Sequence, residues 1–315
     1  MRTIHAAVLL SLLASKAGAW GVSHQGTSGA QFLKIGPSAR AAAMGEAYTA
    51  LCEDAYAVYY NPAGLGFLKD TQAAAMHNAY FQDIRHDFGA IAVPLLAWTD
   101  SRRERNEFGT AAFGLTSLGV SGIERRGVVE TDQPTDTFGA SDFAYAFGYG
   151  FPLSPALSAG AAFKVIDQTL DSAHSTAFAL DAGALYRKDK LSLAGGLRNM
   201  GTASTLGTGK DPLPFLLYGG TAWRFTESWG VSADLRLPRD QRVGFSFGTE
   251  YRRKFSEDIS GALRGGYNTS TTDAEGLTGV TFGAGAAYGG VEFDFAWVPF
   301  GDLGNTFKYS LQVRF

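Results

Sequence analysis

The stretch Thr306-Phe307-Lys308-Tyr309-Ser310-Leu311-Gln312-Val313-Arg314-Phe315 ends the chain and alternates strictly between polar and apolar residues. This period of two is typical of a strand with one polar and one apolar face. The apolar face is largely aromatic, and a chain end of this kind would fray in water unless something covered it. A membrane would cover it, because about ten residues suffice for a spanning strand when a closed barrel pairs its backbone. The alternative is an edge strand of a soluble sandwich.

The composition favours the membrane interpretation. Charged residues are 18% and aromatic residues 13% of the 315 residues, and 40 residues are glycine. Typical soluble domains have about 25% charged residues and about 7% glycine. The net charge of −3 shows no basic excess of the kind that nucleic-acid binding requires. After residue 20 no apolar run approaches the roughly 18 residues of a membrane helix. Outer-membrane barrels have this composition, because alternation dilutes their apolar residues.

Residues 1–19 have the pattern of a secretory signal. Arg2 and His5 precede the apolar run 6–14, and the small residues 17–19 form a cleavage site. We therefore expect the mature chain to begin near Trp20. The single cysteine, Cys52, excludes an intramolecular disulfide and is expected to be a small buried residue.

From residue 72 onward the chain is a series of alternating segments of about ten residues, separated by turn residues. Fourteen segments are predicted as strands: 72–80, 87–96, 107–117, 142–152, 157–167, 176–187, 191–199, 214–225, 229–237, 243–254, 259–267, 277–288, 291–298 and 306–315. The short links follow even-numbered strands, and the longest links, 118–141 and 200–213, follow odd-numbered ones. The 97–106 link is longer than this rule allows. The parity is typical of a barrel with short periplasmic turns, longer outer loops and both termini in the periplasm.

The sequence thus predicts an all-β membrane protein, a 14-stranded antiparallel transmembrane β-barrel over residues 71–315, in the bacterial outer membrane. Residues 20–70 do not alternate. Segments 38–45 and 53–60 are predicted as short helices, and Pro62 ends the second because proline disfavours the helical conformation at Asn61. Residues 63–66 are predicted as a loop. Unpaired backbone cannot face lipid, so this segment must lie inside the barrel or in the periplasm.

The predicted inward faces of several strands carry small residues: Gly148, Gly150, Gly160, Ala162, Gly196, Gly283 and Gly285. Small residues either relieve crowding in a curved sheet or let another piece of backbone approach closely. We favour the second explanation, because residues 20–70 have a suitable size and polarity. They are predicted to form a hatch in the barrel, with Asn61-Pro62-Ala63 as a fixed turn on the periplasmic side.

No catalytic pattern is present. The histidines outside the signal, His24, His77, His86 and His174, lack the spacing of metal ligands. There is no nucleophile elbow, phosphate-binding loop or zinc helix. We expect no catalytic residue, no metal and no cofactor, and a protein that is not an enzyme. A barrel hydrolase, whose catalytic residues need not be neighbours in sequence, is the alternative.

Ordered motifs along the chain resemble a known family. They are 31–36 (QFLKIG), 39–50 (ARAAAMGEAYTA), 53–65 with its Asn61-Pro62-Ala63-Gly64, 163–166 (FKVI), 180–186 (LDAGALY), 199–201 (NMG), 213–214 (LP), 219–225 (GGTAWRF) and 298–306 (VPFGDLGNT). This set is similar to the PorV/PorQ family, within the wider FadL-like group of outer-membrane proteins. The resemblance implies a 14-stranded barrel with an N-terminal hatch. It also implies that Phe315 ends the signal read by the barrel-assembly machinery.

The resemblance implies two functions. PorV-like proteins hold exported cargo of the type IX secretion system, and PorQ-like members belong to the surface attachment complex. We therefore predict a secretion-associated barrel that binds cargo or partner proteins at the cell surface. FadL-like proteins instead admit hydrophobic small molecules, so the alternative is a passive transporter of long-chain fatty acids or other hydrophobic compounds. A structural barrel or an enzyme is a third possibility.

One pair of charged residues is predicted inside the barrel. Lys164 and Asp181 both lie on inward faces by alternation. If the turn between their strands is centred near residue 172.5, the numbers of two opposite residues add to 345. Because 164 plus 181 is 345, Lys164 and Asp181 are predicted to stand opposite each other. Opposite residues on one face of an antiparallel pair interact directly, and a filled lumen favours pairing of buried charges. The pair either anchors the hatch or satisfies two lumenal charges. A register shifted by two residues, or competition from Asp167 or Arg198, is the alternative.

Overall fold

The computed structural model describes residues 25–80, 84–95, 108–128, 132–207, 209–271 and 276–315. The predicted signal at 1–19 and the whole of the long 97–106 link lie outside these residues. No helix among the described residues is both long and apolar enough to cross a membrane.

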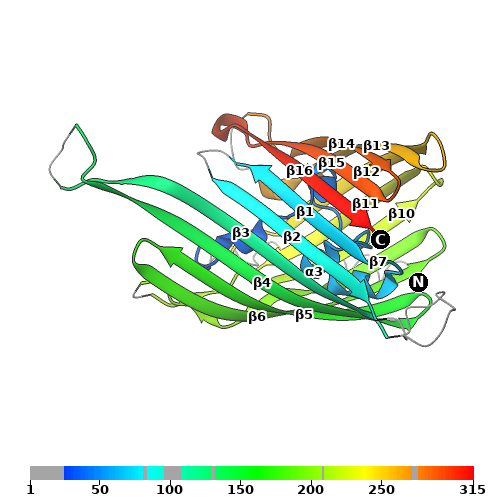
Figure 1. Ribbon diagram of the computed structural model, residues 1–315, viewed down its shortest axis with the longest axis horizontal. Coiled ribbons are helices and arrows are strands. Elements are labelled where there is room, and N and C mark those ends of the chain that lie inside the picture. The colour runs from blue at the N-terminus through cyan, green and yellow to red at the C-terminus, as the bar shows by residue number, and fades with distance from the viewer. Residues whose placement is uncertain (1–24, 81–83, 96–107, 129–131, 208, 272–275) are drawn as a thin grey trace, which may run out of the picture.

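Fourteen antiparallel strands form a closed barrel, which β1 and β16 complete by pairing with each other (Figure 1). The strands are β1 (Gln72–Ala79), β2 (Arg85–Pro94), β3 (Thr110–Arg125), β4 (Asp136–Ser154), β5 (Leu157–Leu170), β6 (Ala173–Lys188), β7 (Leu191–Gly201), β10 (Leu216–Arg224), β11 (Trp229–Pro238), β12 (Gly244–Lys254), β13 (Ile259–Asn268), β14 (Val280–Tyr288), β15 (Val291–Pro299) and β16 (Asn305–Arg314). A separate two-stranded pair, β8 (Ala203–Ser204) and β9 (Asp211–Pro212), lies in the link between β7 and β10. The predicted 14-stranded barrel is confirmed.

The alternation of β16 is realised as predicted. Thr306, Lys308, Ser310 and Gln312 are buried, whereas Phe307, Tyr309 and Leu311 are exposed on the outer surface. The other strands follow the same rule, and their outward aromatic residues give the barrel an apolar outer surface. Alternation requires this result, because successive side chains of a strand point to opposite faces.

The link predicted at 118–141 is wrong. β3 continues to Arg125 and β4 begins at Asp136, and these two residues pair with each other. The register shifts between Val120 and Ile123, where Gly122 has a φ of 73°. A bulge of this kind interrupts the period of two. The parts of β3 and β4 beyond it therefore do not show the alternation by which a strand is predicted from sequence. The resulting β3–β4 ribbon extends past the neighbouring strands (Figure 1).

We call residues 25–71 the N-terminal segment. It contains two short α-helices, α2 (Ala39–Ala43) and α3 (Ala57–Tyr60), and two 3₁₀-helices, η2 (Gln31–Lys34) and η3 (Pro62–Phe67). Two other single-turn helices, η4 (Thr269–Thr271) and η5 (Gly301–Leu303), lie in links between strands. α2 falls within the helix predicted at 38–45, and the helix predicted at 53–60 is reduced to its last turn. The loop predicted at 63–66 is wrong, because Asn61 caps a short helix through a hydrogen bond from Ala63 N to its Oδ1 (3.2 Å) and Pro62 occupies its first position.

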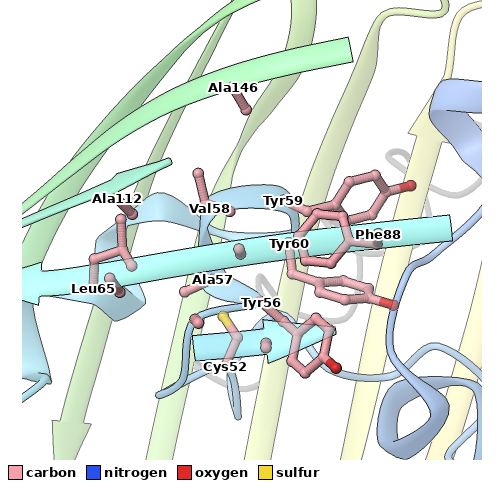
Figure 2. Packing of buried hydrophobic residues seen from close by; sticks show 14 of the residues in the cluster. Cys52, Tyr56, Ala57, Val58, Tyr59, Tyr60, Leu65, Phe88, Ala112 and Ala146 are labelled. Carbon is pink, nitrogen blue, oxygen red and sulfur yellow. The ribbon is translucent and has the colours of Figure 1, made fainter. Parts of the chain in front are cut away.

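The N-terminal segment lies against the inward face of the barrel wall. α2 packs on β13, β14, β15 and β16, whereas η3 packs on β4, β5 and β6. Between them, Val58 and Tyr56 of the α3 region belong to a buried cluster with Phe88, Ala112 and Ala146 of the wall (Figure 2). The segment therefore touches the wall on both sides.

Candidate binding cavity inside the barrel

The Asn61-Pro62-Ala63-Gly64 motif is anchored to the wall at the end of the barrel that carries the short turns. Asn61 is fully buried, and its Nδ2 donates to the carbonyl oxygens of Thr49 (3.2 Å) and Ala184 (3.3 Å). The Ser158 hydroxyl donates to the carbonyl oxygen of Ala63 (2.7 Å). A Cβ at Gly64 would lie 1.8 Å from the carbonyl oxygen of Cys52, so only glycine fits there. The motif is thus a rigid, close-packed turn.

Glycines of the wall make room for this turn. A Cβ at Gly160 would lie 2.3 Å from the carbonyl carbon of Pro62, and one at Gly150 would lie 2.5 Å from the nitrogen of Gly66. At the opposite wall, a Cβ at Gly283 would meet Ala43 at 2.4 Å. Gly196 and Gly285 instead lie against wall residues. Close approach of the segment therefore accounts for Gly150, Gly160 and Gly283, and crowding within the wall accounts for Gly196 and Gly285.

Ion pairs join the segment to the wall at several points. The Arg40 guanidinium donates two hydrogen bonds to Glu250, both of 2.9 Å. Lys34 Nζ lies 2.6 Å from Asp240 Oδ2, in the link between β11 and β12. Burial by itself would raise the pKa of the Asp240 carboxyl, but hydrogen bonds from Lys34 and Gln31 hold it below its ordinary value. Sequence reasoning did not find these contacts, because the partners are about 200 residues apart.

Lys164 and Asp181 form a buried ion pair at the inner wall, with Nζ 2.6 Å from Oδ2. The predicted register is wrong by two residues: Lys164 stands opposite Ala179, and Asp181 opposite Ala162. The turn is tighter than expected, since Leu170 already pairs with Ala173. The two side chains meet along a diagonal, which long side chains can span.

Asn199 completes this network. Lys164 Nζ donates to Asn199 Oδ1 (2.9 Å), and the Asn199 backbone N–H donates to Asp181 Oδ1 (2.7 Å). Asn199 has a φ of 58° and lies where the β6–β7 register shifts. The pair therefore holds a bulge in β7. Neither of its two residues forms a hydrogen bond to the N-terminal segment in the described structure, and Lys164 Nζ lies over the Tyr59 ring, 5.7 Å from its centroid.

Phe315 follows β16, and its side chain is exposed on the outside of the barrel. Its backbone N–H donates to the carbonyl oxygen of Thr71 (2.9 Å), so the chain end is held beside the start of β1. Cys52 is buried and free, and burial of this kind suits a packing role.

A cavity of about 230 Å³ lies between the segment and the wall at the end of the barrel that carries the longer links. Apolar lining comes from Leu33, Ile35, Pro214, Leu216, Val298 and Phe300, and charged lining comes from Lys34, Glu46, Arg198, Arg236 and Lys308. A second cavity, of about 390 Å³, lies at the short-turn end beside Trp223, Trp229 and Glu250. The two cavities share no lining residue, and the N-terminal segment lies between them.

The first cavity was not predicted. Arg198 and Arg236 face inward on predicted strands, and Leu216 and Tyr218 of β10 stand opposite them. Two inward arginines are the signal that the sequence carries. Among the described residues no group of three potential metal ligands occurs. Because apolar and charged side chains line the cavity together, it can bind a small molecule through apolar contacts and a few polar groups.

Comparison with known proteins places the fold. No protein-family model matches the chain, and no curated protein sequence does. In structure the chain is similar to the Ralstonia pickettii toluene transporter TbuX, with 13% identity, a TM-score of 0.57, and coverage of 90% of this chain and 99% of that one. It is also similar to a Pseudomonas aeruginosa FadL homologue, with 13% identity, a TM-score of 0.54, and coverage of 93% and 99%. A TodX monoaromatic hydrocarbon channel with the deltaS2 mutation gives 14% identity, a TM-score of 0.51, and coverage of 89% and 97%.

At these identities the likeness shows only the fold. This fold agrees with the FadL-like barrel that the sequence resemblance implies. None of these neighbours is a PorV or PorQ protein, so that finer assignment stays a prediction.

Proposed function

We propose that this protein is a passive conduit for small hydrophobic molecules in the bacterial outer membrane. The observation that carries the proposal is the 230 Å³ cavity between the N-terminal segment and the wall, with its apolar lining. Pockets for small molecules are concave and mostly apolar, with a few polar groups. The names of the structural neighbours, a toluene transporter and a monoaromatic hydrocarbon channel, support the same interpretation. The protein acts without catalysis in this proposal.

In this proposal the N-terminal segment is the hatch that keeps the bore closed, the longer links face outward, and both termini are periplasmic. The close packing of Asn61-Pro62-Ala63-Gly64 against wall glycines supports a plug. Deleting residues 30–66 should leave an assembled but leaky barrel, which sensitivity of cells to large antibiotics would report. An assembled deletion protein with unchanged sensitivity would argue against the hatch. Failure to assemble would mean that the segment is needed for folding.

Cavity filling tests the transport role. Leu216 lines the cavity, and its neighbour Leu217 faces outward on the same strand. Leu216→Trp should lower the uptake of radiolabelled toluene several-fold in cells that express the protein, and Leu217→Trp should not. Heat-modifiable mobility on gels would show that both variants are folded. Toluene uptake equal to that of cells without the protein would contradict the proposal.

The secretion-associated role stays a second candidate because of one feature, the β3–β4 ribbon that extends past the other strands (Figure 1). Such a ribbon offers backbone edges to which a cargo or attachment-complex protein can bind. A pull-down from outer membranes, analysed by mass spectrometry, should recover such partners with the intact protein and lose them when residues 121–135 are replaced by a short turn. Recovery of the barrel-assembly machinery alone would leave the transport role as the better proposal.

A further inference from the structure

Two of the four cations that line the 230 Å³ cavity have carboxylate partners. Lys34 pairs with Asp240 at 2.6 Å, and Lys308 lies 3.4 Å from Glu46. Arg198 and Arg236 have no carboxylate within ion-pair distance in the part of the chain that the structure describes. The cavity therefore has two guanidinium groups without a direct ion-pair partner among the described residues.

The contacts of Arg198 leave part of its guanidinium unused. Its Nη1 donates to the carbonyl oxygen of Tyr59 (3.3 Å), and its plane lies over the rings of Tyr59 and Tyr218, at 4.8 and 5.9 Å. The side chain is buried, and its Nε is without a hydrogen-bond partner among the described residues. A guanidinium has five N–H donors, and an unsatisfied buried donor on a charged group is costly.

Arg236 is in the same situation. One of its terminal nitrogens, Nη2, donates to the Ser246 hydroxyl (2.8 Å) and to Asn268 Oδ1, both neutral acceptors. Its buried Nε is also unpartnered within the described chain. Asp234 is two residues away on the same face, but its Oδ2 accepts from the backbone nitrogens of Tyr48 (3.1 Å) and Thr49 (3.0 Å). Asp234 is thus engaged with the N-terminal segment through one oxygen, and its other oxygen, Oδ1, has no hydrogen-bond partner among the described residues.

The two arginines line the same cavity from strands that are two strand spacings apart. Arg198 on β7 stands opposite Leu216 on β10, and Leu216 stands opposite Pro238 on β11, two residues from Arg236. Neighbouring strands are about 4.8 Å apart, so two strand spacings separate the backbones by roughly 10 Å. Arginine side chains can bridge that distance from both sides, and the guanidinium fork suits a planar or tetrahedral acidic group.

We propose that this cavity binds a compact organic anion, with its acidic group between Arg198 and Arg236 and its apolar body against Pro214 and Leu216. The inference rests on the proposed conduit function and names its substrate class. The volume of about 230 Å³ sets the size. It equals roughly eight water molecules at about 30 Å³ each, which suits one ring or a short chain.

Benzoate and benzyl alcohol test whether the cavity requires a negative charge. Each has one ring, but benzoate carries a carboxylate and benzyl alcohol an uncharged hydroxyl group. Isothermal titration calorimetry with the full chain, purified in detergent at neutral pH, should show benzoate binding at least ten-fold tighter than benzyl alcohol. Arg236→Gln should weaken benzoate binding at least ten-fold and leave benzyl alcohol binding unchanged. Arg253→Gln is the matched control, because Arg253 is an exposed strand arginine near the short-turn end.

Equal affinities of the two compounds for the wild-type protein would overturn the inference without any variant. So would a folded, heat-modifiable Arg236→Gln protein that binds benzoate as well as the wild type. The result is separable from the conduit function. Toluene uptake without a benzoate preference would reject this inference alone. A benzoate preference without uptake of either radiolabelled toluene or radiolabelled benzoate would reject the conduit and leave the anion site.

Discussion

Lys164 on β5 and Asp181 on β6 form a buried ion pair of 2.6 Å although neither stands opposite the other in the strand ladder. Their side chains meet on a diagonal, and both are bonded to Asn199 at the β7 bulge. The bulge displaces Asn199 toward the lumen, so the pair and the irregular strand stabilise each other. Whether the pair also anchors the N-terminal segment stays a proposal.

Breaking this pair should be costly. Lys164→Met and Asp181→Asn should each lower the free energy of unfolding by about 3–5 kcal/mol, because the remaining charge stays buried without its partner. The double variant should cost less than the sum. Urea unfolding in micelles would measure this. The exposed pair Arg126–Glu124 (2.8 Å) is the control, with an expected coupling below about 1 kcal/mol. Zero coupling between positions 164 and 181 would reject the prediction.

Gly160→Ala should loosen the Asn61-Pro62-Ala63-Gly64 turn. The new Cβ would collide with the backbone of Pro62, and overpacking of this kind costs roughly 1–3 kcal/mol. Gly89→Ala is the control, since a Cβ there meets nothing within 4 Å. Limited trypsin digestion should cut the N-terminal segment faster only in the Gly160 variant. Equal digestion of both variants would mean that the wall does not hold the turn.

Leu311→Arg should destabilise the barrel because Leu311 is on the outer face of β16. Arginine costs about 2–4 kcal/mol near the bilayer midplane and less toward the interfaces. Gln312→Arg is the comparison on the inner face. It should cost only about 1 kcal/mol, for the hydrogen bond from Gln312 Nε2 to Gln72 Oε1 (2.7 Å). Unfolding in lipid vesicles measures both, and equal losses would contradict the facing assignment.

Deleting Phe315 should lower the amount of folded protein in the outer membrane, if its exposed ring is part of an assembly signal. Phe315→Trp keeps a terminal aromatic ring and should assemble normally. Heat-modifiable protein in isolated outer membranes is the measure. The prediction fails if the deletion protein reaches the wild-type level.

The Lys34–Asp240 contact should weaken in acid. The pKa of Asp240 in the folded protein is below its ordinary value of 3.8, so its stabilising effect is present above that value and is lost as the pH falls through the folded pKa. Hydrogen exchange of residues 26–34 should therefore be faster in Asp240→Asn than in wild type at pH 6. The difference should shrink below a pH of about 4. A difference that is unchanged in acid would exclude this carboxylate as the cause.

Local sequence determined the barrel, because the period of two is a property of each strand by itself. The alternation of residues 306–315 and its repeats located thirteen other strands and their outward faces. It also assigned Lys164 and Asp181 to the lumen. It failed at Gly122 and at Asn199, where a bulge changes the register, since a bulge is set by contacts with the neighbouring strand.

Tertiary structure alone decided the interior. The small inward glycines had two explanations, and only the packed chain shows that Gly150 and Gly160 touch the Asn61-Pro62-Ala63-Gly64 turn whereas Gly196 and Gly285 touch the wall. Likewise, Arg198 and Arg236 are 38 positions apart in sequence and carry no shared motif. They line one cavity because strand order, register and the path of the N-terminal segment bring them there. These are long-range properties of the closed barrel, which no local pattern encodes.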